Sequence, residues 1–125
     1  MTDNTRVCPF CNAQGVLIES PLCTARRDNF PVTEGHTLVT PNRHVTDYFD
    51  CTRAEKQALW ELVDKVQADL RRTTSAAAFT VGINVGETAG QTVPHAHIHV
   101  IPRYPGDVDD PRGGIRGVLP HKQRY

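Results

Sequence analysis

The sequence lacks any apolar run that approaches the roughly 18–20 residues needed for a transmembrane helix. Its first residues, Met1 to Arg6, are polar and do not form the apolar stretch of a signal peptide. It also lacks an excess of charge, since 14 Lys and Arg balance 14 Asp and Glu, which argues against binding of duplex nucleic acid by bulk charge. We therefore expect a cytoplasmic protein that binds neither a membrane nor duplex nucleic acid.

Internal repeats and low-complexity segments are also absent. A length of 125 residues is typical of one domain, so we expect residues 1–125 to form a single domain, with residues 104–125 as a C-terminal tail. Because the cytoplasm keeps thiols reduced, no disulfide is expected among the four cysteines. Cys23 and Cys51 stand alone and are typical of ordinary small apolar residues.

The clearest element in the sequence is one long helix. Thr52-Arg53-Ala54-Glu55 matches the capping box, in which the Thr hydroxyl accepts a backbone N–H three residues on and the Glu side chain reaches back. The pattern predicts a helix that begins after Thr52 and fades by about Thr73. Apolar residues recur along it at helical spacing: Leu59, Leu62, Val63, Val66 and Leu70.

Short apolar runs between turn residues predict five strands. The first two are expected to form a hairpin across Ser20 and Pro21. Five strands, one long helix and short loops indicate an α+β fold, with a five-stranded, mostly antiparallel sheet and one long helix. The predicted strands are Val16–Glu19, Leu22–Arg27, His36–Thr40, Ala77–Asn84 and His95–Pro102.

Three histidines alternate with apolar residues in the last predicted strand: His95, His97 and His99. Successive strand side chains point to opposite faces, so the imidazoles are expected on one face, about 6.6–7 Å apart. Six histidines in 125 residues give about 0.01 expected occurrences of this pattern by chance. A solvated strand face and a metal site built from all three histidines are alternatives. The favoured interpretation is catalysis by groups that can act as nucleophile, acid and hydrogen-bond donor near neutral pH.

A second group of reactive residues is Cys8-Pro9-Phe10-Cys11, near the N-terminus. A thioredoxin-type redox pair would precede a helix in a βαβ pattern, which is not predicted here. With two distant histidines, the motif is typical of half a tetrahedral zinc site. The candidate histidines are His44, His95 and His121. The alternative is two reduced thiols that bind no metal.

The histidine alternation resembles the signature of the histidine-triad (HIT) family, His-φ-His-φ-His-φ-φ with φ apolar. The resemblance extends from Cys8 to Arg103 and implies a HIT-like fold and a nucleotide-binding hydrolase or transferase, usually a homodimer. The other matching segments are Gly82-Ile83-Asn84-Val85-Gly86, Ala89-Gly90-Gln91-Thr92-Val93, Gly35-His36-Thr37-Leu38-Val39, Pro41-Asn42-Arg43-His44 and Ile101-Pro102-Arg103.

The resemblance also implies catalytic roles. His97 is expected to attack an α-phosphate and form a covalent nucleotidyl-histidine, which water then hydrolyses. His99 is expected to donate to a phosphate oxygen or to the leaving group, and His36 to orient the triad. A neutral imidazole suits the first role, since its ordinary pKa near 6.5 leaves it mostly uncharged at pH 7.

Four further residues match substrate-binding positions of the family: Asp28, Asn84, Gln91 and Thr92. The resemblance implies that Asp28 holds the ribose hydroxyls and that the other three donate to phosphate. Residue chemistry alone leaves alternatives, with Asp28 as a turn former and with Asn84 and Gln91 as amides that cap loops.

Zinc-containing relatives, which include the galactose-phosphate uridylyltransferases, have metal ligands that correspond to Cys8, Cys11, His44 and His95. The resemblance thus implies a closed, structural zinc site with four protein ligands. Many family members carry a short helix after the CxxC motif that helps form the base pocket. Only residues 12–15 separate the motif from the first predicted strand here, so no base preference is implied.

These residues are compatible with three functions. The first is asymmetric hydrolysis of a dinucleoside polyphosphate, such as diadenosine tetraphosphate, and the second is cleavage of the P–N bond of a nucleoside phosphoramidate. The third is a zinc-stabilised nucleotide-binding adaptor, which would not need the intact His97. Arg112 and Arg116 in the tail are either a polyphosphate clamp or part of a solvated surface, and the clamp favours the first function.

Overall fold

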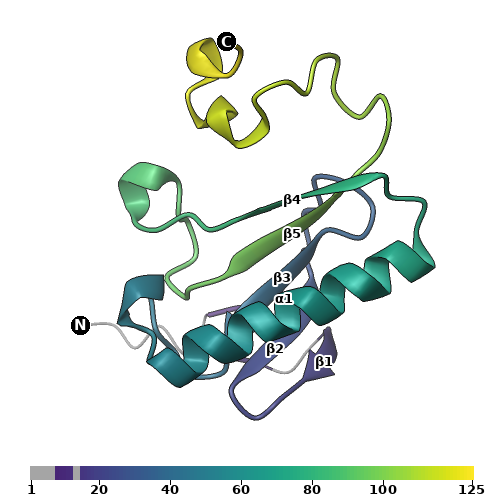
Figure 1. Ribbon diagram of the computed structural model, residues 1–125. Helices are drawn as coiled ribbons and strands as arrows, with labels where there is room; N and C mark the ends of the chain where they lie inside the picture. Colours follow the sequence, from purple (N-terminus) through teal and green to yellow (C-terminus); the bar gives the residue numbers. More distant parts are fainter. Residues whose placement is uncertain (1–7, 13–14) are drawn as a thin grey trace.

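The computed structural model describes residues 8–12 and 15–125. A five-stranded sheet lies at its centre, and one long helix crosses one face of that sheet (Figure 1). The strand order is β1-β2-β3-β5-β4, and every neighbouring pair is antiparallel. The predicted α+β class is therefore confirmed. The strands are β1 (Val16–Glu19), β2 (Cys23–Arg27), β3 (Thr37–Pro41), β4 (Ala78–Gly82) and β5 (Ile98–Arg103).

The helix α1 (Arg53–Thr73) begins as the capping box predicts. The Glu55 backbone N–H donates to the Thr52 hydroxyl at 3.0 Å, and the Thr52 N–H donates to the Glu55 carboxylate at 2.8 Å. Its apolar residues are buried against the sheet, which removes them from water and forms the core. The buried apolar residues of the helix are Leu59, Leu62, Val63, Val66 and Leu70.

The sheet face opposite α1 carries a row of functional side chains. Arg26 in β2 pairs with Leu38 in β3, and Leu38 pairs with His99 in β5. Because strand side chains alternate between faces, their neighbours along the chain point toward α1. Those neighbours belong to the core: Ala25, Val39, Ile98 and Val100.

The predicted strand His95–Pro102 was too long at its start, because β5 begins at Ile98. The Ala96 N–H donates to the Val45 carbonyl at 2.7 Å, and the His95 carbonyl accepts from the His97 ring at 2.8 Å. These backbone groups therefore do not pair with β3. The predicted strand Ala77–Asn84 was also too long, because β4 ends at Gly82.

The C-terminal tail contains two short 3₁₀ helices, η3 (Gly114–Val118) and η4 (Pro120–Lys122), which the sequence did not predict. In Figure 1 the tail lies above the outer strand β4. A Cβ atom on Gly82 would lie 3.0 Å from the Ile115 side chain, so glycine permits this close approach. Within the described residues, no helix has the length and apolar character needed to cross a bilayer.

Candidate functional site

A cavity of about 670 Å³ lies on the sheet face opposite α1. This volume falls within the range of small-molecule sites. Five of the seven residues predicted to be catalytic or substrate-binding line it: His97, His99, Asp28, Asn84 and Thr92. The cavity lining does not include His36 or Gln91, which lie behind it and act on the lining residues through hydrogen bonds.

His97 is held in one tautomer by the backbone. Its Nδ1 atom lies 2.8 Å from the His95 carbonyl oxygen. A carbonyl can only accept, so Nδ1 carries the proton, and the Nε2 atom of a neutral His97 has a free lone pair. The side chain is 8% exposed and lines the cavity. A buried imidazole with a fixed, unprotonated Nε2 is arranged as a nucleophile.

The protonation of His99 is fixed by a chain of hydrogen bonds. The Val32 backbone N–H donates to Nδ1 of His36 at 3.0 Å, so a neutral His36 carries its proton on Nε2. That Nε2 lies 2.9 Å from Nδ1 of His99 and donates to it. His99 consequently carries its own proton on Nε2 and is a hydrogen-bond donor in the cavity lining.

Burial keeps both members of this pair uncharged. The pKa of His99 is lowered to about 4, mainly by burial and also by the neighbouring imidazoles of His97 and His36, whose effects outweigh the opposite effect of Asp28. Burial also lowers the pKa of His36, although the Asp28 carboxylate partly opposes this shift. At pH 7 the pair therefore supplies neutral hydrogen bonds rather than positive charge.

Asp28 stands beside this pair at the end of β2. Its Oδ1 atom accepts the Phe30 N–H at 2.9 Å, which forms the turn that the alternative interpretation predicted, and its Oδ2 atom lies 3.5 Å from Nε2 of His36. Asp28, His36 and His99 lie close enough to hold a metal ion. However, a metal on Nε2 of His36 needs a proton on Nδ1, where the Val32 N–H already donates. This cluster is thus built as a hydrogen-bond relay.

The loop between β4 and β5 is shaped by its glycines and by Gln91. Gly90 has φ of +96°, a left-handed conformation that glycine adopts readily, at the end of the 3₁₀ helix η2 (Glu87–Ala89). The Gln91 amide accepts from the Gly86 N–H at 2.9 Å and donates to the carbonyls of Thr46 at 2.8 Å and Val93 at 3.0 Å. Gln91 caps this loop and thereby supports Thr92 in the cavity wall.

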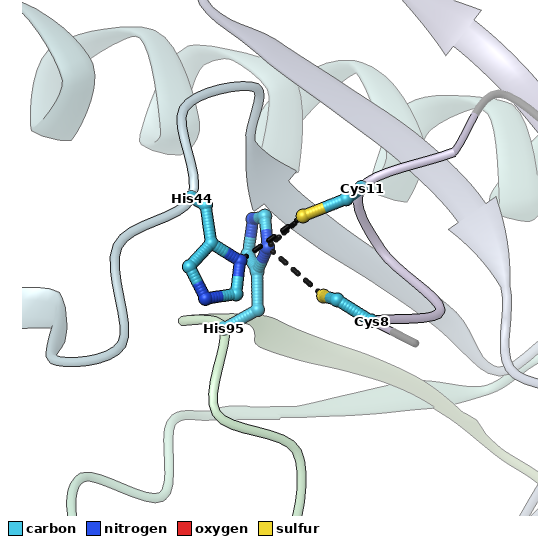
Figure 2. Close-up of side chains that lie close together, drawn as sticks. All are labelled: Cys8, Cys11, His44 and His95. Carbon is cyan, nitrogen blue, oxygen red and sulfur yellow. Dashed lines mark hydrogen bonds between the residues drawn. The ribbon is translucent and has the colours of Figure 1, made fainter. Parts of the chain in front are cut away.

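The structure brings the four predicted metal ligands together (Figure 2). Their ligand atoms all lie within 4.8 Å of one another. The Sγ atoms of Cys8 and Cys11 lie 3.4 and 3.5 Å from Nδ1 of His95, and Sγ of Cys11 lies 3.0 Å from Nδ1 of His44. Tetrahedral zinc separates its sulfur and nitrogen ligands by about 3.5 Å. The donor set and its spacing therefore suit zinc, and His121 lies outside the cluster.

The two histidines of the Cys/His cluster are oriented by contacts behind them. Nε2 of His95 donates to the Pro41 carbonyl at 2.8 Å, so its Nδ1 lone pair faces the cysteines. The loop that carries His44 is fastened to the start of α1, where Arg43 donates to both Glu55 carboxylate oxygens at 2.9 and 3.1 Å. These hydrogen bonds lower the pKa of the buried Glu55.

Several residues that the sequence did not predict also line the cavity, and two of them, Arg26 and Phe10, contact each other. Both line the cavity, and Arg26 donates to the carbonyls of Pro9 at 2.9 Å and Phe10 at 3.3 Å. The sequence places Arg26 in a predicted strand but gives no sign that it contacts the loop of the CxxC motif. Its pairing with a loop 16–17 residues earlier depends on the fold.

The fold and the site together define a small α+β protein with three neighbouring histidines, two of them at a cavity, beside a Cys/His cluster. The family model described as the HIT domain matches residues 11–106. The chain therefore belongs to the HIT family.

Comparison with individual proteins supports the same assignment. The chain is 39% identical over 94 residues to the bifunctional bis(5'-adenosyl)-triphosphatase/adenylylsulfatase FHIT of Arabidopsis thaliana, with 75% of this chain and 52% of the relative covered. It is 44% identical over 80 residues to the asymmetrical bis(5'-nucleosyl)-tetraphosphatase of Schizosaccharomyces pombe, with 64% and 44% covered. The chain thus spans about half the length of these two relatives.

Among solved structures, the chain is similar to a Zn-bound histidine triad family protein from Mycobacterium smegmatis. The TM-score is 0.75 at 30% sequence identity, and the match covers 82% of this chain and 79% of that one.

Proposed function

We propose that this protein hydrolyses a dinucleoside polyphosphate at an α-phosphate through a covalent nucleotidyl intermediate on His97. The observation that carries the proposal is the tautomer of His97. Its Nδ1–H is donated to the His95 carbonyl, and the free Nε2 lone pair belongs to a side chain that lines a nucleotide-sized cavity.

In the first step, the Nε2 lone pair of His97 attacks the α-phosphorus and forms a P–N bond. The bond from phosphorus to the bridging oxygen breaks, and the shortened phosphate chain leaves with those electrons. The Nε2–H of His99 donates a hydrogen bond to the phosphate or the leaving oxygen and retains its proton. This role suits a histidine whose pKa is about 4, because it is a neutral donor at pH 7.

In the second step, water attacks the phosphorus and the P–N bond breaks. The electron pair of that bond returns to Nε2 of His97, and the proton of the attacking water passes to solvent. The adduct is a good electrophile because its imidazole keeps the Nδ1 proton and is positively charged, which favours departure of the ring. The products are a nucleoside monophosphate and the shortened polyphosphate.

The remaining cavity residues are proposed to hold the substrate. Asp28 supplies a carboxylate that can accept from both hydroxyls of a ribose, while Asn84 and Thr92 supply neutral donors for phosphate oxygens. Gln91 acts through the loop that it caps, and His36 acts through His99. These two are positioning residues.

The names of the relatives favour a polyphosphate substrate over a phosphoramidate. Two of them are named for cleavage of bis(5'-adenosyl) triphosphate and of bis(5'-nucleosyl) tetraphosphate. The free Nε2 of His97 also argues against a pure adaptor, since binding alone needs no nucleophile.

We further propose that Cys8, Cys11, His44 and His95 hold a structural zinc ion. Four protein ligands leave no open position for water or substrate, so the metal supplies folding stability rather than reactivity. The Zn-bound relative from Mycobacterium smegmatis supports this assignment.

A substrate panel with identification of the products tests the proposal. Diadenosine tri- and tetraphosphate, adenosine phosphoramidate and a nucleotide sugar are incubated with the protein, and the first two are expected to give AMP fastest. His97→Ala is expected to lose several orders of magnitude in kcat while it still binds nucleotide. His121→Ala, on the exposed tail, serves as the control with unchanged kcat.

The covalent step has a separate test. Quenching with alkali is expected to leave a nucleoside monophosphate on the peptide that contains His97, because the adduct is acid-labile. In His97→Gly, free imidazole is expected to restore part of the turnover of an activated substrate. Inversion of configuration at phosphorus would indicate a single attack by water and would contradict the intermediate.

A further inference from the structure

The loop between the two cysteine ligands borders both the metal cluster and the cavity. Cys8 and Cys11 flank Pro9 and Phe10, and the Cys11 N–H donates to the Cys8 carbonyl at 3.2 Å. The Phe10 ring lies 5.0 Å from the His97 ring, with an interplanar angle of 65°. It also lies 6.0 Å from the His95 ring. One short loop therefore contacts a metal ligand and the nucleophile at once.

Arg26 holds this loop against the sheet. Its Nη1 and Nη2 atoms donate to the carbonyls of Pro9 and Phe10, and its guanidinium lies 5.6 Å from the centre of the Phe10 ring. The residue is only 6% exposed. Among residues 8–12 and 15–125, no carboxylate forms an ion pair with Arg26, and its buried Nε atom has no hydrogen-bond partner.

A buried guanidinium without a carboxylate is costly and is compensated here mainly by the loop. Two carbonyls and one aromatic face are its contacts. Both Nη atoms donate to carbonyls of the loop, and the Nε atom is buried. The hydrogen bonds of Arg26 therefore hold the loop, while the residue also lines the cavity.

We infer that Arg26 is a positioning residue that couples the metal-ligand loop to His97, by holding the Phe10 ring against the imidazole. The ring and the His95 carbonyl restrain His97 from two directions, so that its Nδ1–H stays on the carbonyl and its Nε2 stays free. Loss of the Arg26 contacts releases the loop, which weakens metal binding and lets the His97 ring rotate. The inference rests on the proposed zinc site where it concerns metal affinity and on the proposed hydrolysis where it concerns turnover, whereas the contact of Phe10 with His97 depends on neither.

The test compares Arg26→Met with Phe10→Leu. Arg26→Met keeps the apolar stem but removes both donors, so zinc affinity, measured by competition with a chelator, is expected to fall about 10- to 100-fold. Phe10→Leu keeps the backbone carbonyls, and its zinc affinity is expected to stay within about twofold of the original. The matched control is Arg71→Met, which removes an arginine 5.7 Å from the Phe79 ring, outside the site.

The second readout is the tautomer of His97, measured by ¹⁵N NMR of the zinc-loaded protein. Both Arg26→Met and Phe10→Leu are expected to lower the fraction of the Nδ1–H form, and Arg71→Met to leave it unchanged. In kinetics with diadenosine tetraphosphate, both variants are expected to lower kcat about tenfold or more with little change in KM.

Three outcomes would overturn the inference. In the first, Arg26→Met keeps both the original zinc affinity and the original His97 signals. In the second, Phe10→Leu raises KM at unchanged kcat, which would mean that the ring contacts the substrate. In the third, only the control alters the tautomer. If Arg26→Met does not fold, the same measurements are made on Phe10→Leu and Arg26→Lys. The NMR and zinc measurements need no turnover, so failure of the proposed function is recognised separately.

Discussion

His36 donates a hydrogen bond of 2.9 Å to His99, and the direction of this bond is set by the backbone of Val32. The Val32 N–H occupies the Nδ1 lone pair of His36 and leaves its proton on Nε2. His99 therefore receives at Nδ1 and presents an N–H from Nε2. A backbone amide four residues before His36 thus decides which nitrogen of His99 is the donor in the cavity lining.

Replacing His36 is expected to impair the catalytic role of His99 while the His99 side chain itself remains in place. His36→Phe keeps a ring of similar size but leaves Nδ1 of His99 buried without its partner, a loss worth about 1–3 kcal/mol. We expect kcat to fall about 10- to 100-fold in steady-state kinetics with diadenosine tetraphosphate. His36→Gln, whose amide can donate, is expected to recover part of the loss. An unchanged kcat in His36→Phe would show that His99 needs no fixed tautomer.

The buried histidine pair also makes stability depend on pH. His99 titrates near 6.5 when unfolded, but burial lowers its pKa to about 4 in the folded protein, and burial lowers the pKa of His36 as well. Between these values the unfolded chain binds more protons. The free energy of unfolding is therefore expected to fall as the pH decreases from about 6.5 toward 4.

Urea unfolding at pH 7 and pH 5 checks this dependence. The midpoint of the original protein is expected at lower urea at pH 5, and His99→Gln is expected to lose less stability on acidification because it lacks one of the titrating groups. Asp28, His36 and His97, the ionisable groups that act on His99, are present in both proteins, so their own titration is retained in the comparison. Equal losses in both proteins would contradict the assignment of the pH effect to His99.

Zinc content and thermal stability test the Cys/His cluster. The purified protein is expected to contain about one zinc per chain. Cys8→Ser and His44→Ala are expected to lower both the zinc content and the melting temperature, because metal binding is coupled to folding. His121→Ala removes a histidine outside the cluster and is expected to change neither. Absence of zinc in protein prepared without a chelator would contradict the proposal.

Features set by neighbouring residues were predictable from the sequence. The capping box needs only Thr52 and Glu55, three residues apart, and the helix begins where it predicts. The alternation of His99 with Ile98 and Val100 correctly predicts which residues face the core. These predictions are correct because they depend only on local geometry, such as the side-chain period of two in a strand.

Features set by distant backbone groups were not predictable in the same way. The start of β5 shifts to Ile98 because the carbonyl of Val45 takes the Ala96 N–H. Gln91 has the chemistry of a phosphate donor, but the carbonyl of Thr46 and other loop groups engage its amide. Val45 lies 51 residues from Ala96, and Thr46 lies 45 residues from Gln91, so only the fold brings these carbonyls near.

The tail supports a last prediction, which concerns assembly. Four large apolar side chains of the tail are exposed: Ile115 by 58%, Val118 by 76%, Leu119 by 56% and Tyr125 by 82%. The tail lies above the outer strand β4 in Figure 1, and the Ile115 side chain approaches Gly82 of that strand, which has a neighbour in the sheet on one side only. Exposed apolar groups and an open strand edge both favour association with another chain. We therefore expect a homodimer that buries the tail.

Light scattering at micromolar concentration is expected to give twice the mass of one chain. Replacing both Val118 and Leu119 by Asp is expected to reduce the mass to that of a monomer, because burying two carboxylates in an apolar contact costs far more than the contact supplies. Leu17→Asp introduces one carboxylate at an exposed apolar position on β1, at the opposite edge of the sheet, and is expected to leave the dimer intact. A monomeric mass for the unaltered protein would rule out the dimer, whereas dissociation by Leu17→Asp alone would move the contact from the tail to the β1 edge.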